Sequence, residues 1–193
     1  MTKINPFLLC LLSILLTSLF LGCKSEIPND EDEVILKKLK DNEAKFIFKL
    51  DGNDFYKTES IFDGNLQLYP TTFALASFDQ FDSNVMIHLS GNDIFKYKPI
   101  KIPLNIENGH TSPVMFGRMK DKQNNLGEGY LMSEGFITFK ALSRERIIMK
   151  IEGKAKKYPR TKDTDPSFEV SALIVCKKPK VGYADIDEKK TFY

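Results

Sequence analysis

The spacing of hydrophobic side chains becomes strand-like at residue 45. In the segment KFIFKL, Phe46, Phe48 and Leu50 are spaced two residues apart and would share one face of a strand. Short apolar runs follow, most of them bounded by Gly, Asn, Asp, Ser or Pro: LQLY, TFALASF, NVMIHLS, PIKIPLNI, VMFGRM, GFITFKAL, RIIMKIEG and FEVSALIV. Because no helical period separates these runs, the pattern predicts an all-β domain, an antiparallel β-sandwich or barrel-like fold of about 8–10 strands.

Turn residues and prolines refine this prediction. The tetrapeptide DGND at 51–54 predicts a tight or bulged hairpin after the first strand. Pro99 and Pro103 flank Ile-Lys-Ile and place that strand at an edge or a bend, because proline cannot donate to a sheet ladder. The three glycines of NNLGEGYLMSEG at 124–135 predict a flexible loop. Residues 45–193 are therefore expected to form one domain.

The first 22 residues have the pattern of a secretory signal. Lys3 precedes an apolar stretch from Phe7 to Leu21 that contains no acidic residue. The stretch is about 15 residues long, whereas a helix needs about 20 to cross the hydrocarbon layer of a membrane. It ends on Leu-Phe-Leu-Gly, and Cys23 follows directly.

The segment from Leu19 to Cys23 resembles the lipobox of bacterial lipoproteins, although Phe20 stands where leucine is usual. The resemblance implies cleavage between Gly22 and Cys23 and attachment of diacylglycerol to the Cys23 thiol, with the new amine often acylated as well. Two or more fatty chains hold a protein on a membrane stably, where one does not. The alternative interpretation is a transmembrane anchor with a chance cysteine.

Residues 23–44 are expected to link this anchor to the domain. The polar segment 24–33, KSEIPNDEDE, predicts an acidic tether, and 34–43 could form a short helix with a narrow apolar stripe. An acidic cluster soon after a lipidated cysteine also resembles the export signal of surface lipoproteins in Bacteroidota. We therefore expect a lipid-anchored protein of the cell envelope in the outer membrane, displayed on the surface or held on the periplasmic face.

Charge and cysteine content narrow the class of protein. Without residues 1–22 the chain has 193 − 22 = 171 residues, with 28 − 1 = 27 basic and 26 acidic side chains, so no overall field would attract nucleic acid. Residues 140–180 carry 12 basic and 5 acidic side chains, which form either ordinary solvated surface or a patch for an anionic surface. Cys176 is the only cysteine after Cys23, and in SALIVC it is expected to be a buried strand residue.

Three further segments resemble small uncharacterised lipoproteins of Bacteroidota. They are FIFKLDGNDF at 46–55, EGFITFKALSRERIIMKIEGKA at 134–155, and DIDEKKTFY at 185–193. The last resembles the closing strand of those proteins, with Thr191 where they carry glycine. The resemblance implies a β-sandwich and no enzymatic activity.

The sequence offers only weak candidates for a metal-binding or catalytic site. His88 and His110 are the only histidines, too few for the usual catalytic zinc site, so we expect neither a metal nor a cofactor. The loop at 51–54 offers oxygen ligands for calcium but lacks the EF-hand pattern, and a hairpin turn explains it better. Asp79 and Asp82 could form a carboxylate pair for glycoside hydrolysis, although any chain with 26 acidic residues offers such pairs. We name no catalytic residue.

The sequence therefore favours a membrane-anchored lipoprotein with a non-enzymatic binding or interaction domain. Its expected partners are the membrane itself and an envelope protein, a glycan or an anionic surface. The absence of Trp lowers the expectation of a sugar-stacking platform. Candidate recognition loops are ENGHTSP, KDKQNNLGEG and KKYPRTKDTDPS. The alternatives are a glycan- or ester-directed hydrolase with a dispersed carboxylate site and a structural or assembly accessory of the envelope.

Overall fold

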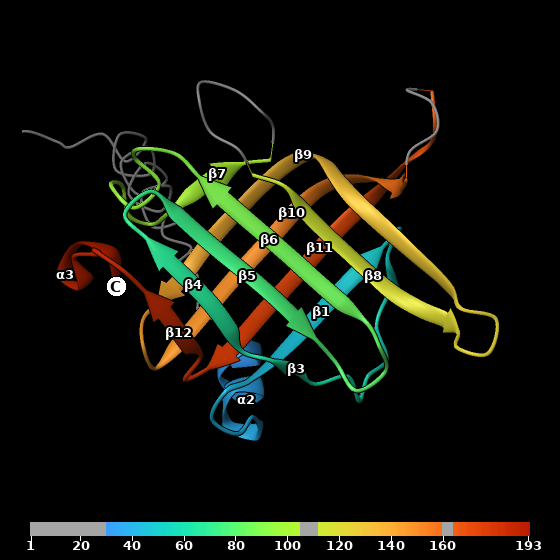
Figure 1. The fold of residues 1–193 in the computed structure, drawn as a ribbon, viewed down its shortest axis with the longest axis horizontal. Coiled ribbons are helices and arrows are strands. Elements are labelled where there is room, and N and C mark those ends of the chain that lie inside the picture. The colour runs from blue at the N-terminus through green and yellow to red at the C-terminus, as the bar shows by residue number, and fades with distance from the viewer. Residues whose placement is uncertain (1–29, 105–111, 160–163) are drawn as a thin grey trace, which may run out of the picture. The chain divides into compact units, whose positions relative to one another are not determined.

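The computed structural model describes residues 30–104, 112–159 and 164–193 (Figure 1). The predicted leader, the cleavage site at Gly22 and Cys23, and His110 lie outside the described residues. Residues 31–193 form one compact unit with its own hydrophobic core.

The described part of the chain contains twelve strands and two helices, and nine of the strands are at least four residues long. The prediction of an all-β fold with about 8–10 strands is therefore confirmed. In chain order the elements are α2 (Asp30–Lys38), β1 (Glu43–Leu50), β2 (Asn53–Asp54), β3 (Phe62–Asp63), β4 (Asn65–Tyr69), β5 (Thr72–Phe78), β6 (Asn84–Ser90), β7 (Lys101–Pro103), β8 (Val114–Asp121), β9 (Leu126–Leu142), β10 (Arg146–Tyr158), β11 (Ser167–Lys177), β12 (Lys180–Tyr183) and α3 (Glu188–Thr191).

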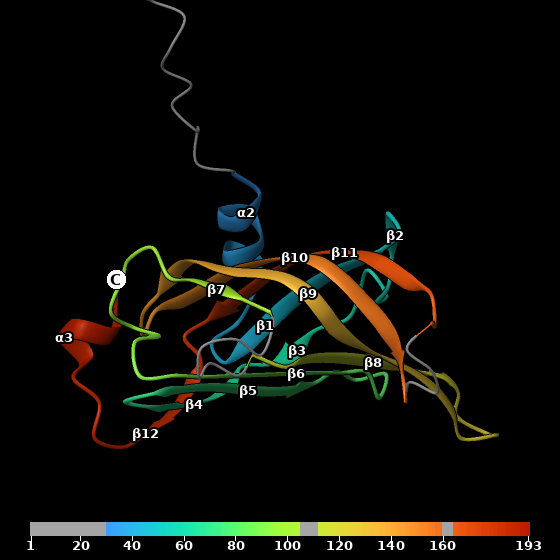
Figure 2. The same ribbon diagram turned by 90° about the horizontal axis from the view of Figure 1, so that it is seen from above.

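All twelve strands belong to one sheet that folds over on itself. Its order is β12-β4-β5-β6-β8-β9-β10-β11-β1-β2, with β3 beside β1 and β7 beside β9. Neighbouring strands are antiparallel except β12, which runs parallel to β4. Figure 2 shows β4, β5, β6 and β8 in one layer and β1, β10 and β11 in the other, with β9 running from the first layer to the second. The result is an open β-sandwich.

Two glycines mark the bend in β9 and β10. Gly135 and Gly153 face each other across the two strands with φ angles of +129° and +151°. A Cβ atom on Gly135 would overlap the carbonyl oxygen of Glu152, and one on Gly153 would overlap that of Glu134. Only glycine fits this close approach. On one side of the bend β9 pairs with β8, and on the other side it pairs with β7.

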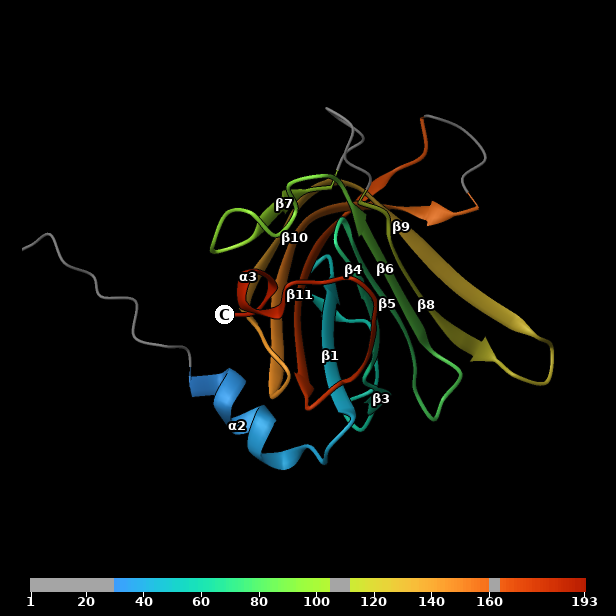
Figure 3. The same ribbon diagram turned by 60° about the vertical axis from the view of Figure 1, so that its left-hand side comes forward.

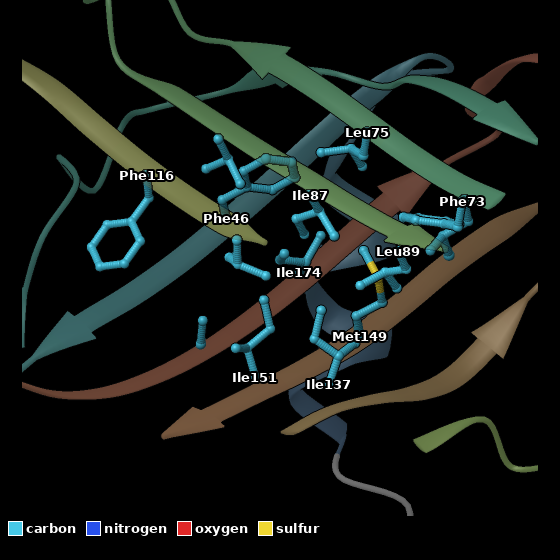
Figure 4. Close-up of a cluster of buried hydrophobic side chains, with 14 of the residues drawn as sticks. Phe46, Phe73, Leu75, Ile87, Leu89, Phe116, Ile137, Met149, Ile151 and Ile174 are labelled. Atoms are coloured by element: carbon cyan, nitrogen blue, oxygen red, sulfur yellow. The ribbon is translucent and has the colours of Figure 1, made fainter. Parts of the chain in front are cut away.

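The core fills the space between the two layers (Figure 4). Alternate strand positions supply it, as the sequence period predicts: Phe46 and Phe48 of β1 are 1 % exposed. Cys176 is also buried, as expected, and burial, followed by the charge of Asp63, raises the pKa of its thiol to about 12. The labelled side chains in Figure 4 are Phe46, Phe73, Leu75, Ile87, Leu89, Phe116, Ile137, Met149, Ile151 and Ile174.

Helix α2 covers part of the outer face of the layer that contains β1, β10 and β11 (Figure 2). Just after the helix, Leu39 is buried against Ala141, Ile148 and Val175. Residues 30–38 are helical, whereas the sequence predicted a helix over 34–43 and assigned the acidic residues before it to the tether.

The earlier start of α2 has an electrostatic cause. Acidic residues in a first helical turn interact favourably with the positive end of the helix dipole. Here Asp32 also pairs with Lys140 of β9, and Glu33 pairs with Arg146 of β10. The acidic block therefore fastens the helix to the sheet.

Two further expectations from the sequence are wrong in detail, and one strand was not predicted. The glycine-rich segment at 124–135 is not a loop, because β9 begins at Leu126 and includes Gly127, Gly129 and Gly135. The last segment is not a closing strand: α3 forms instead, with the Asp187 side chain accepting a hydrogen bond from the amide of Lys189 as its N-cap. The run KVGY, which the sequence analysis passed over, is β12.

Candidate functional site

The inward face of β8 changes character along its length. Val114 and Phe116 are buried in the core, and by alternation Arg118 and Lys120 lie on the same face. Figures 1 and 3 show the β8–β9 hairpin reaching past the ends of the neighbouring strands. Beyond that point inward-facing side chains line an open cleft instead of packing in the core.

This cleft has a volume of about 490 Å³ and lies between three segments of the chain. They are the stretch after β2, the β5–β6 turn and the β8–β9 hairpin. Four basic side chains lie among the lining residues: Lys57, Arg118, Lys120 and Lys122. Clefts of this size are common ligand sites. We call it the end cleft.

Aromatic rings close the floor of the end cleft against the core. Phe55 lies edge-on to Phe116 with ring centroids 5.0 Å apart, and Phe116 stacks on Tyr130 at 5.5 Å. The Tyr56 hydroxyl donates to the carbonyl oxygen of Asn84 at 2.7 Å. Burial, followed by the charge of Asp79, raises the pKa of Tyr56 well above its ordinary value. The Tyr56 hydroxyl therefore stays protonated and serves as a structural donor.

A single carboxylate organises two of the cations. Glu128 of β9 lies directly opposite Arg118, and its Oε1 accepts from the Arg118 Nε at 2.7 Å. Its Oε2 is 2.7 Å from the Nζ of Lys120. Burial by itself would raise the pKa of Glu128, but the hydrogen bonds and charges of Lys120 and Arg118 outweigh burial and lower it. Glu128 is thus ionised at neutral pH and is shared between two cations.

The other wall of the cleft carries a cation without a carboxylate partner. The Nζ of Lys57 lies 3.9 Å from the centre of the Phe81 ring, and among the described residues no carboxylate is within ion-pair distance of it. Lys122 pairs with Asp82 at 2.7 Å. Glu128 and Asp82 pair with three of the four cations, and Asp79 is a third nearby carboxylate, so the described side chains leave a local net charge of 4 − 3 = +1.

The loop that carries Phe81 is fixed by Asp79. Its Oδ1 accepts hydrogen bonds from the amides of Phe81 at 2.9 Å and Ser83 at 2.7 Å. This carboxylate is therefore directed at the backbone of its own turn, while Asp82 is directed at Lys122. The structure does not bring Asp79 and Asp82 together as an acid and base facing a common substrate position.

The remaining predicted site residues are dispersed. His88 is exposed on the outer face of β6, and no group of three or more His, Cys, Asp or Glu side chains that could hold a metal exists among the described residues. The DGND hairpin is confirmed: Asp51 and Gly52 both have positive φ, and the Asp51 Oδ1 accepts from the amide of Glu169 at 2.8 Å. That carboxylate oxygen therefore makes a structural hydrogen bond.

The basic surplus of residues 140–180 is partly neutralised by acidic neighbours. Lys154 pairs with Glu134 at 2.9 Å, and Lys178 pairs with Asp41 at 3.1 Å. Several cations of this region thus act in cross-strand or surface pairs, so its charge count overstates its attraction for an anion.

A second surface feature lies on the outer face of the layer that contains β5, β6 and β8. Ala76, Met86, Met115 and Leu131 occupy one row across four neighbouring strands, and Met86 is 50 % exposed. A shallow groove of about 370 Å³ runs beside the row, over the glycines of the β8–β9 pair. This face differs from the outer face of the other layer, which α2 partly covers.

The end cleft is not apparent from the sequence, because its residues come from distant segments of the chain. A signal was present in VMFGRMK, where the alternation that places Val114 and Phe116 in the core continues into Arg118 and Lys120. In this chain the change from apolar to basic inward positions along β8 marks the point where the end cleft begins.

Comparisons with known proteins give no assignment. Among the described residues, neither helix has the length or the apolar character needed to cross a membrane. No protein-family model, no curated protein and no solved structure matches the chain.

Proposed function

We propose that the chain is a lipid-anchored protein of the cell envelope whose β-sandwich binds a ligand at the end cleft without converting it. The observation that carries the binding part is the surplus of positive charge over an apolar floor, in an open cleft of ligand size. The anchoring part rests on the sequence around Cys23.

The side chains of the end cleft suit binding better than catalysis. Asp82 is the carboxylate among its lining residues, and Glu128 lies behind Arg118 and Lys120; both carboxylates are held in ion pairs with basic neighbours. A glycoside hydrolase needs one carboxyl group that holds a proton and a second that faces the substrate. The lowered pKa of Glu128 disfavours the first role.

The first experiment tests the anchor. Mass analysis of the protein recovered from membranes should show fatty chains on a first residue that corresponds to Cys23. Cys23→Ser should release the protein into the soluble fraction, while Cys10→Ser should leave it in the membrane, because Cys10 belongs to the part that is removed. An unmodified Cys23, or membrane retention of Cys23→Ser, contradicts the anchoring proposal.

The second experiment tests binding against hydrolysis. The full chain in non-ionic detergent is incubated with envelope glycans and lipids, and bound material is eluted and analysed. We expect a ligand recovered with its bonds intact and a binding signal that Lys57→Glu removes. Accumulation of cleaved glycan or ester, sensitive to Asp79→Asn or Asp82→Asn, would support the hydrolase alternative.

A further inference from the structure

We propose that the end cleft is a site for a phosphate-class oxyanion, with Lys57 and Lys120 as the donors that contact it. This inference rests on the proposed binding function and specifies its ligand. The shared chemistry is a phosphate group, carried either by a lipid head group or by a soluble molecule.

The geometry favours an anion because basic groups converge there from two walls. Lys57 comes from the segment after β2, and Lys120 from β8, and both line the end cleft. Each ammonium has three N–H donors. Lys120 directs one donor to Glu128, and no described carboxylate pairs with Lys57. Donors therefore remain on both walls for an incoming oxyanion.

Neighbouring groups hold these cations in place before any ligand arrives. Glu128 fixes Arg118 and Lys120 side by side, and the Arg118 guanidinium lies 4.5 Å from the centre of the Phe55 ring. The Phe81 ring supports Lys57, and the Asp79 turn supports the backbone of Phe81. Positioning the donors in advance reduces the entropy lost when a ligand binds.

The apolar floor strengthens the attraction. Phe55 is 2 % exposed and Tyr56 is 7 % exposed, so the cations stand over rings instead of bulk water on that side. Coulombic attraction is stronger at a surface backed by low-dielectric material than in open solvent. Arg118 contributes mainly charge, because Glu128 and the carbonyl oxygen of Phe55 already accept hydrogen bonds from it.

The test uses inorganic pyrophosphate as a soluble probe for the full chain in non-ionic detergent, followed by calorimetry. Binding should be detected at low salt and should weaken as salt is raised. Lys57→Glu should weaken it about tenfold or more, because a charge-assisted hydrogen bond is replaced by repulsion. Lys120→Ala should weaken it by a smaller factor.

Lys101→Glu is the matched control. The Lys101 Nζ lies 4.4 Å from the centre of the Phe136 ring, an arrangement like that of Lys57 on Phe81, but on β7 and outside the end cleft. The same charge reversal there should leave pyrophosphate affinity unchanged within about twofold. Equal losses in Lys101→Glu and Lys57→Glu would show a nonspecific charge effect and overturn the proposal.

A second arm identifies the source of the phosphate. Cosedimentation with phosphatidylcholine vesicles is compared with and without phosphatidylglycerol, using Cys23→Ser protein so that the anchor does not contribute. Capture that requires phosphatidylglycerol and Lys57 indicates a lipid head group, and pyrophosphate binding without such capture indicates a soluble ligand. Absence of both overturns the inference, and a non-phosphate envelope ligand bound without competition from pyrophosphate overturns it while leaving the proposed binding function intact.

Discussion

The two ends of the sandwich use the same strand alternation to different effect. At one end the chain terminus seals the core: the Tyr193 hydroxyl donates to the carbonyl oxygen of Phe139 and accepts from the amide of Ile100, both at 2.9 Å. Backbone hydrogen bonds join Tyr193 to Leu142 in both directions. At the other end the β8–β9 hairpin extends beyond its neighbours (Figure 3). The end cleft lies beside this hairpin.

The contrast shows that an inward-facing position is a core position only where a second layer stands opposite it. Phe116 meets Phe48 of β1 with ring centroids 4.9 Å apart, and two residues later on the same face Arg118 meets Glu128. The sealed end gains stability from backbone hydrogen bonds. At the open end, carboxylates only partly offset the repulsion between the basic side chains. This arrangement favours ligand binding over stability.

The largest effect should come from the joint between the two ends. Gly153→Ala places a Cβ against the carbonyl oxygen of Glu134 at a φ of +151°, so we expect a loss of about 2–4 kcal/mol in the free energy of unfolding. Urea denaturation measures it. Gly127→Ala is the control, because a Cβ there meets its nearest atom, the carbonyl oxygen of Arg118, at an ordinary 3.5 Å. Equal stability of the two variants contradicts the account of the bend.

The second-largest effect should come from a substitution at the sealed end. Tyr193→Phe removes the hydroxyl that accepts from the amide of Ile100 and leaves that part-buried N–H unpaired, at a cost of about 1–2 kcal/mol. Tyr69→Phe, at a more exposed position on β4, should cost much less. Thermal unfolding compares the two. A Tyr193→Phe protein as stable as the parent would mean that the terminus does not seal the core.

Glu128 at the open end should have a smaller and pH-dependent effect. Its pKa is lowered in the folded state, so its ionised form stabilises the protein above the ordinary value of 4.5, and this contribution is lost as pH falls through the folded-state pKa. Glu128→Gln should cost under about 1 kcal/mol at pH 7. Denaturation across pH 3–7 should show the two proteins converging in acid. A difference that widens as pH falls contradicts the ion-pair assignment.

The smallest effect on stability should come from Lys57. Lys57→Ala removes a contact with the Phe81 ring and no ion pair among the described residues, so stability should change by about 0.5 kcal/mol or less. Pyrophosphate affinity should nevertheless fall, which separates binding from folding. A large loss of stability would show that Lys57 has a structural role, which contradicts its assignment as a ligand-binding residue.

Much of the fold follows from the sequence because alternation is a local property. The DGND hairpin, the edge position of the proline-flanked strand β7 and the burial of Cys176 were all predicted from neighbouring residues, and the structure confirms them. The glycine-rich start of β9 was not predicted as a strand, because glycines in a strand have no local sequence signature that separates them from glycines in a loop. KVGY forms a strand through its parallel partner β4, more than a hundred residues earlier in the chain.

The end cleft could not be predicted from local sequence patterns, because it too depends on contacts between segments far apart in the chain. Lys57, Phe81 and Lys120 belong to three separate segments, and only the folded sheet brings them together. The sequence shows a basic surplus only at 140–180, where either ordinary solvated surface or a patch for an anionic surface was expected. There Lys154 and Lys178 find acidic partners through sheet pairing and loop contacts that composition does not encode.

The most direct test of the account is to follow the backbone amide resonances of the full chain while inorganic pyrophosphate is added. Saturable shifts should concentrate at Lys57, Phe81 and Lys120, and Ile100, Leu142 and Tyr193 at the sealed end should stay unchanged. Shifts centred on the sealed end or on residues 140–180, or no saturable shift at low salt, would contradict the assignment of the open end as the binding end.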